Sequence, residues 1–243
     1  MRDRLWRYRF KSERPSIEYL MKCNFSGTTI LDIGANFGVY SYYMSKAAGP
    51  HGELTAFEAQ SELGIHLDAV KETYHLDNLT IVKQSLSSVP GVSKMRRSKV
   101  GSGGASFHYA AGVDLEKIDI PVITFDEYLS ANQHTPISFI KCDVELHELD
   151  VLRGGEQTLS EYMPTLLFEC HEDQAEDGEL FSYLTGLGYD GFFYFLRPSD
   201  HKSLLRNNKA EYRHFSEFRD YPYPRPSVHH RNYIFLKKGE RPI

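Results

Sequence analysis

The segment from Asp32 to Gly38 combines one acidic residue and two glycines directly after an apolar run. Asp32 lies near the end of the run 28–33, and Gly34 and Gly38 flank the turn beyond it. Glycines permit tight turns and let the backbone approach a ligand closely. Glu58 follows the next apolar run, 20 residues after Gly38. A carboxylate there can accept hydrogen bonds from both ribose hydroxyls of a nucleoside. This spacing predicts a site for a nucleoside-containing cofactor.

The order of acid and glycine in this segment distinguishes two classes of cofactor. A dinucleotide site needs G-x-G-x-x-G, with a pyrophosphate at a helix N-terminus. Here Asp32 takes the place of the first glycine, two residues before Gly34. An acid at a strand end would repel a pyrophosphate but suits the amino group and sulfonium of S-adenosylmethionine. An NAD(P)-linked oxidoreductase remains the alternative. The residues that we expect to hold the cofactor are Asp32, Gly34, Asn36, Gly38, Glu58 and Ser85.

Two further polar clusters follow apolar runs and are candidates for the reacting end of the site. One extends from Asp143 to Glu148, and the other contains Glu169 and His171. Methyl transfer is an in-line displacement, so an enzyme must align the nucleophile and remove its proton. We expect Asp143 or His147 to be the base. Alternatively, a bound cation can lower the pKa of an acceptor hydroxyl. Hard cations favour carboxylate oxygens, so Mg²⁺ is the candidate metal. Its expected ligands are Glu145, Glu169 and His171.

The elements that must position these residues alternate along the chain. Apolar runs predict seven strands, at 28–33, 54–57, 79–82, 137–142, 165–168, 189–196 and 232–236. Apolar residues at helical spacing separate most of them, which predicts an α/β fold, a Rossmann-like, mostly parallel sheet with helices on both faces. The last two runs have no clear helix between them and predict an antiparallel hairpin at one edge. Residues 85–113 are expected to form an irregular excursion or a weak hairpin over the sheet edge, and the proline-rich linker within 197–228 is expected to be irregular.

The size and charge of the chain restrict its class. It has 243 residues and a net charge of −5, which favour one large domain and disfavour a dedicated nucleic-acid binder. We expect an N-terminal helical extension over 1–27 and a catalytic domain over 28–243. Three cysteines, no signal-like segment and no apolar stretch long enough to span a bilayer predict a cytoplasmic protein. Residues 2–14 carry five arginines and one lysine between aromatic residues. They are expected to form a solvated helix whose aromatics pack on the domain; a lid or a homodimer arm is the alternative.

Two long motifs resemble those of one family. Residues 29–41 are similar to the first motif of FkbM-type methyltransferases, DIGANxGxYS, and residues 139–149 are similar to their second, FIKIDVEGHEL. The resemblance covers about residues 28–171 and the last strand. It implies the class I methyltransferase fold and O-methylation of hydroxyls on sugars, glycans or secondary metabolites. By position it makes Asp143 the candidate base and Glu145 and Glu169 candidate Mg²⁺ ligands. The sequence departs from the family at Leu146, where glycine is usual, and a cofactor-binding partner subunit without catalysis is a further alternative.

Overall fold

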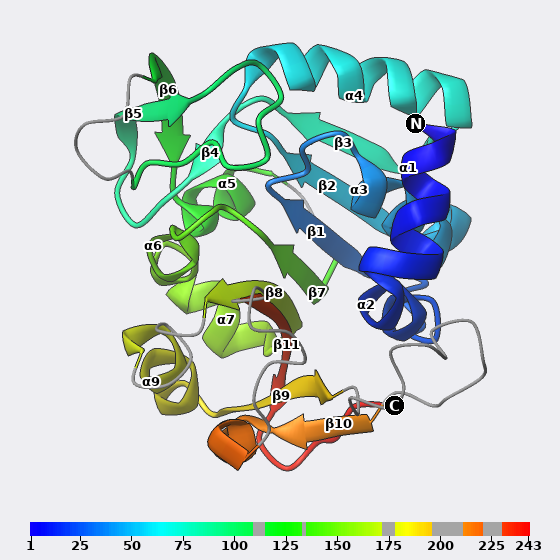
Figure 1. Cartoon of the computed structure of the whole chain (residues 1–243), viewed down its shortest axis with the longest axis vertical. Helices are drawn as coiled ribbons and strands as arrows, with labels where there is room; N and C mark the ends of the chain where they lie inside the picture. Colours follow the sequence, from blue (N-terminus) through cyan, green and yellow to red (C-terminus); the bar gives the residue numbers. More distant parts are fainter. Residues whose placement is uncertain (109–114, 133–134, 172–177, 196–210, 221–229) are drawn as a thin grey trace.

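The computed structural model describes residues 1–108, 115–132, 135–171, 178–195, 211–220 and 230–243. A twisted sheet lies at the centre of the described part of the chain (Figure 1). Its strand order is β10-β9-β11-β8-β7-β1-β2-β3. The strands are β1 (Thr29–Ile33), β2 (Glu53–Phe57), β3 (Leu79–Val82), β7 (Ile137–Cys142), β8 (Thr165–His171), β9 (Tyr189–Phe195), β10 (Glu211–His214) and β11 (His230–Lys237).

Five neighbouring strands, β3, β2, β1, β7 and β8, are parallel to one another, as the alternation of strands and helices predicted. β11 enters antiparallel between β8 and β9, so the two late strands do pair at one side of the sheet. The predicted number of strands was wrong, because the sheet has eight strands in the described part of the chain. The additional strand, β10, has only four residues and pairs with the outer edge of β9. A strand this short shows no clear alternation, and the edge of β9 supplies its partner.

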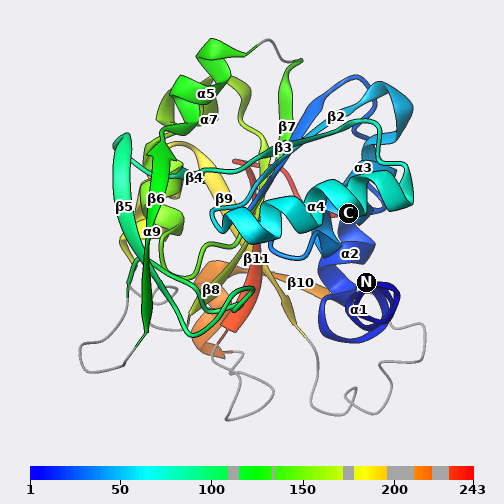
Figure 2. The ribbon, with the colours of Figure 1, turned by 90° about the horizontal axis from the view of Figure 1, so that it is seen from above.

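Helices cover both faces of the sheet, and each face has its own core (Figure 2). One face is covered by α2 (Arg14–Leu20), α3 (Val39–Ala48) and α4 (Ser61–Tyr74). The other face is covered by α5 (Phe125–Ala131), α6 (Glu148–Arg153), α7 (Glu156–Tyr162) and α9 (Glu179–Gly186). Adjacent residues of a strand enter opposite cores, Ile30 on the first face and Leu31 on the second. This follows from the two-residue period of a strand, and it explains why the central strands are apolar throughout.

A second, smaller sheet lies beyond the carboxyl ends of β1 to β3 (Figure 1). It consists of β4 (Ser85–Leu86), β5 (Gly91–Arg97) and β6 (Glu116–Ile123), in the order β4-β6-β5. β5 and β6 form a regular antiparallel ladder from Gly91↔Val122 to Arg97↔Glu116. Of the two expectations for residues 85–113, the hairpin therefore describes β5, which pairs with β6, better than an irregular excursion does. The second strand of this hairpin, β6, has apolar residues at alternate positions, Ile118, Ile120 and Val122. It lies after the segment 85–113, so that segment contains only one of the two paired strands.

The N-terminal segment forms α1 (Arg2–Arg7), a π-helical turn (Tyr8–Ser12) and α2. Ile17 and Leu20 of α2 have no exposed surface and belong to the first core. Trp6 and Phe10, in contrast, are 53% and 48% exposed, so these two aromatics do not pack on the domain as expected. Among the described residues, no helix has both the length and the apolar character needed to cross a membrane.

Candidate active site

Two adjoining cavities lie at the carboxyl ends of the parallel strands. The larger has a volume of about 500 Å³, and the smaller about 50 Å³. Both are lined by Gly34 and Asn36 of the turn after β1, and by Asp143 and Glu145 after β7. Ligands bind at this edge in open α/β sheets because the strand ends leave a crevice there. Both cavities therefore lie beside the turn after β1, at which the sequence predicts the cofactor site.

The turn after β1 packs directly against the turn after β7. Gly34 has a φ of +79°, and an added Cβ would lie 2.0 Å from the carbonyl oxygen of Asp143. Only glycine fits there, because any side chain would overlap a main-chain atom. Asn36 has a φ of +50°, which asparagine tolerates better than most residues. Gly38, with a φ of +75°, precedes the first residue of α3. The glycine spacing thus forms the tight strand-to-helix turn that the motif predicted.

Glu58 and Ser85 line the smaller cavity, together with Phe107. The carboxylate of Glu58 accepts hydrogen bonds from the backbone N–H of Asn36 at 2.7 Å and of Gln60 at 2.8 Å. Burial raises the pKa of Glu58, and these two N–H donors oppose that rise. One donor reaches each carboxylate oxygen, so each oxygen keeps acceptor capacity for a ligand.

Asp32 lies behind this turn and lines neither cavity. It has no exposed surface, and its carboxylate accepts a hydrogen bond from the Ser41 hydroxyl at 2.5 Å. The ammonium of Lys141 lies 3.7 Å from Asp32 and 3.3 Å from the carboxylate of Asp143. Lys141 also donates to the carbonyl of Gly34 at 3.3 Å. Asp32 thus reaches the site through Lys141.

Sequence reasoning did not single out Lys141, although a lysine inside the apolar run 137–142 is an available signal. Burial by itself lowers the pKa of Lys141, but Asp143 and Asp32 outweigh burial and raise the pKa above its ordinary value. The ammonium therefore stays charged, and it holds the Asp143 carboxylate at the wall of both cavities.

Further carboxyl groups line the larger cavity. Burial, with a contribution from Asp143, raises the pKa of Glu145 to about 7 and that of Glu169 to about 8. Glu13 of the N-terminal segment also lines it, and accepts hydrogen bonds from the Asn232 amide at 2.7 Å and the Tyr40 hydroxyl at 3.0 Å. Burial raises the pKa of Glu13 as well. No sequence pattern indicates a role for Glu13, because only packing brings it to this cavity.

These raised pKa values predict that the chain becomes less stable as the pH rises from about 4.5 to about 8. The ordinary value for a glutamate is 4.5, so the folded chain retains protons on Glu145 and Glu169 that the unfolded chain releases. Their contribution is complete below pH 4.5 and is lost as the pH rises through 7 and 8. Thermal melts across this range should show a falling melting temperature, and Glu169→Gln should reduce the fall. Substitution of Glu72, which is exposed on α4, with glutamine should not change the slope; a slope equally steep in Glu169→Gln would contradict the assignment.

His147 is the N-cap residue of α6 and lines neither cavity. Its ring nitrogens are 2.9 Å from the Ser87 hydroxyl and 3.2 Å from the ring of His108. Of the two predicted bases, only Asp143 lines the cavities.

The described residues do not support the predicted Mg²⁺ site. Glu145 and Glu169 line one cavity, but they do not form a group of three donor atoms close enough for a shared ion. The side chain of His171 lies outside the described residues.

Leu146, where the resembled family has glycine, has a φ of +73° and is 41% exposed. A left-handed conformation costs a leucine about 1–2 kcal/mol, which exceeds the added entropy cost of a glycine. Leu146→Gly should therefore raise the free energy of unfolding by about 0.5–1 kcal/mol in urea titrations. Leu146→Ala removes the side chain but keeps the strain, and should give no such gain. A loss of stability in Leu146→Gly would show that packing of the leucine side chain outweighs the strain.

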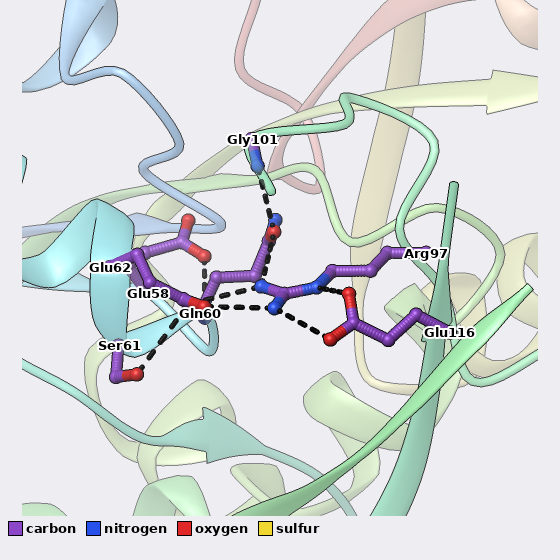
Figure 3. Close-up of polar contacts among 7 residues, drawn as sticks. All are labelled: Glu58, Gln60, Ser61, Glu62, Arg97, Gly101 and Glu116. Carbon is purple, nitrogen blue, oxygen red and sulfur yellow. Dashed lines mark hydrogen bonds and ion pairs between the residues drawn. The ribbon is translucent and has the colours of Figure 1, made fainter. Parts of the chain in front are cut away.

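A buried arginine fixes the glycine-rich loop that follows β5 (Figure 3). Arg97 is 3% exposed and forms ion pairs with Glu62 and Glu116, both at 2.8 Å. It also donates to the side-chain oxygen of Gln60 at 3.2 Å, which in turn accepts from the backbone N–H of Gly101 at 3.0 Å. Residues 101–103 of this loop line the larger cavity. Because Gln60 also donates to Glu58, the network connects this loop to the residue expected at the ribose.

A model of the methyltransferase FkbM domain matches residues 32–190, more than half of the chain. No curated protein matches the chain significantly. Solved structures share the fold at low sequence identity, and their likeness concerns the fold alone.

Three of these structures illustrate the likeness. The methyltransferase FkbM from Methylobacillus flagellatus KT has a TM-score of 0.55 and 15% identity, covering 88% of this chain and 45% of its own. The chain thus spans less than half of that protein. A putative rRNA-methylase from Clostridium thermocellum has a TM-score of 0.53 and 11% identity, covering 95% and 97%. A putative methyltransferase from Streptococcus mutans in complex with SAH has a TM-score of 0.51 and 7% identity, covering 93% and 97%. The domain match shows that the chain belongs to the FkbM methyltransferase family, and the solved methyltransferases share its fold.

Proposed function

We propose that this chain transfers a methyl group from S-adenosylmethionine to a hydroxyl oxygen of a sugar, a glycan or another small natural product. The observation that carries the proposal is the position of Asp143. Its carboxylate lies in the wall shared by both cavities and is held by the buried ammonium of Lys141. A base at this junction can reach an acceptor in one cavity while the methyl donor extends from the other.

The smaller cavity suits the nucleoside part of the cofactor. Glu58 keeps one acceptor direction free on each carboxylate oxygen for the two ribose hydroxyls. Ser85, Leu86 and Phe107 supply polar and apolar surface for the adenine. Gly34 and Asn36 then form the passage into the larger cavity. The carboxylates beyond that passage suit a cofactor whose methionine end carries an ammonium and a sulfonium.

The larger cavity is proposed to hold the acceptor. S-adenosylmethionine supplies an electrophilic methyl group with a good leaving group. The residues around it align the acceptor oxygen and remove its proton. As the oxygen–methyl bond forms and the carbon–sulfur bond breaks, the hydroxyl proton passes to the carboxylate of Asp143. Arg4, Lys99 and Glu169 add donors and acceptors around the same cavity, which suits an acceptor rich in hydroxyls.

The cofactor and the reaction can be tested separately. S-adenosylhomocysteine should raise the melting temperature of the chain, whereas NAD⁺ and NADP⁺ should leave it unchanged. Stabilisation by a nicotinamide dinucleotide alone would overturn the cofactor assignment. The chain should then be incubated with S-adenosylmethionine labelled in its methyl group and a panel of sugars and polyhydroxylated metabolites, and the label transferred to each acceptor measured. A panel of amines serves as the control set of acceptors. Label transferred only to amines would contradict O-methylation while leaving the cofactor assignment intact.

A further inference from the structure

Three side chains of types that can ligate a metal ion lie together outside both cavities. His108 follows the glycine-rich loop, His147 precedes α6, and Asp150 lies within α6. One donor atom from each lies within 4.8 Å of the other two. None of the three lines either cavity, so the group is distinct from the proposed reacting site. We propose that these three residues bind a divalent transition-metal ion of the Zn²⁺ class.

Two of the three distances between donor atoms match those expected around a small, tetrahedral ion, and the third is within 4.8 Å. The Nε2 atom of His108 is 3.2 Å from the Nδ1 atom of His147, which is 3.4 Å from an Oδ2 atom of Asp150. Ligands about 2.0–2.1 Å from Zn²⁺ at tetrahedral angles lie roughly 3.3–3.4 Å apart. Two imidazoles with one carboxylate favour Zn²⁺ and its transition-metal neighbours over Mg²⁺, which prefers all-oxygen sites.

The outer atoms of the ligands have partners that orient them. The Nε2 atom of His147 lies 2.9 Å from the Ser87 hydroxyl, so its Nδ1 atom faces the group. The Oδ1 atom of Asp150 accepts from the Ser88 hydroxyl at 3.0 Å, which leaves Oδ2 for the ion. Hydrogen bonds of this kind fix the tautomer and orientation of metal ligands. Two adjacent serines, Ser87 and Ser88, therefore orient two of the three ligands.

A hydrogen bond between His108 and His147 accounts for the position of the two rings but not for the approach of Asp150 to the same nitrogen. One proton between the two rings makes a single hydrogen bond, and an N–H on Nδ1 of His147 is shared between Nε2 of His108 at 3.2 Å and the Asp150 oxygen at 3.4 Å. A cation satisfies all three atoms at once. It would also connect two segments that already touch, since Ser106 donates to the carbonyl of Glu145 at 2.5 Å. Phe107, next to His108, lines the smaller cavity, so the ion would stabilise that wall.

The test measures metal binding by the full chain without an assay of activity. Protein freed of metal and of any affinity tag should bind one equivalent of Zn²⁺ in calorimetric titrations, and Mg²⁺ should give no binding. His108→Ala and Asp150→Asn should weaken Zn²⁺ binding about 100-fold or more, and Ser87→Ala about 10- to 100-fold. His108 is exposed and Asp150 half-buried, so both variants should fold, which circular dichroism checks.

His51→Ala is the matched control, because His51 is exposed and lies outside the group. This variant should bind Zn²⁺ like the unaltered chain. In addition, Zn²⁺ should protect the loop 98–108 from proteolysis in the unaltered chain and in His51→Ala, but not in His108→Ala. Failure of the unaltered chain to bind Zn²⁺ would overturn the proposal, as would equal binding by His108→Ala and Asp150→Asn. Neither result bears on the proposed methyl transfer, which this measurement does not use.

Discussion

Replacing Gly34 with alanine is expected to weaken binding of S-adenosylhomocysteine by more than about 100-fold and to lower the free energy of unfolding by about 2–4 kcal/mol. The new Cβ would lie 2.0 Å from the carbonyl oxygen of Asp143. In addition, the backbone at position 34 has a φ of +79°, which alanine rarely adopts. The obstacle is main chain, so it cannot rotate away as a side chain would. The turns after β1 and β7 must separate, and both line the two cavities. Calorimetric titration and urea unfolding measure the two effects.

Gly27→Ala separates backbone strain from the overlap with Asp143. Gly27 has a nearly equal φ of +75°, but an added Cβ would have nothing within 4 Å. This variant should lose only about 1–2 kcal/mol of stability and retain its affinity for S-adenosylhomocysteine. Wild-type affinity in Gly34→Ala would show that the two turns can separate without cost to the site, and would contradict the proposed cofactor position.

Asp143→Asn is expected to lower kcat by about 10²–10⁴-fold, the usual contribution of a positioned base. Asparagine keeps the shape of the side chain but cannot take a proton from the acceptor hydroxyl. Binding of S-adenosylhomocysteine should change little, since Glu58, Ser85 and the Gly34 turn remain. The measurement is the rate of methyl transfer at saturating cofactor, with cofactor affinity determined in parallel.

Glu169→Gln is the matched variant for the base, because Glu169 is a second carboxyl group in the wall of the larger cavity. It should raise KM for the acceptor more than it lowers kcat. A large loss of kcat in Glu169→Gln with an unchanged rate in Asp143→Asn would assign the base to Glu169. Loss of cofactor binding in Asp143→Asn would instead place Asp143 at the methionine end of the cofactor.

Local patterns were sufficient for most of the sheet. Continuous apolar runs such as 137–142 form strands buried on both faces, and all seven predicted strands belong to the central sheet. The order of Asp32, Gly34 and Gly38 predicted a strand-to-helix turn, because positive φ values at this spacing require residues that tolerate them. The edge strand β10 was missed, since its formation depends on pairing with β9 and not on a pattern of its own.

The residues that approach the site from distant segments could not be inferred in this way. Glu13 comes from the N-terminal helices and bonds to Asn232 of the last strand, 219 residues away. Arg97 reaches Glu62 and Gln60 only because the second sheet lies beyond the ends of the first. Asp32 showed the opposite case, since its position in the motif indicated a cofactor ligand while the fold placed it behind Lys141.

The sequence by itself determined the class of the fold and the place of the cofactor turn, because both depend on residues close together in the chain. Periodicity sets which face of a strand is buried, and glycine spacing sets where the backbone can turn. The tertiary structure alone decided which acidic groups share a cavity, which of them is held by Lys141, and which histidines meet outside it. These contacts join residues that are far apart in the chain, such as Glu13 and Asn232, and they depend on packing. The resulting burial also sets the pKa values of the buried carboxyl groups.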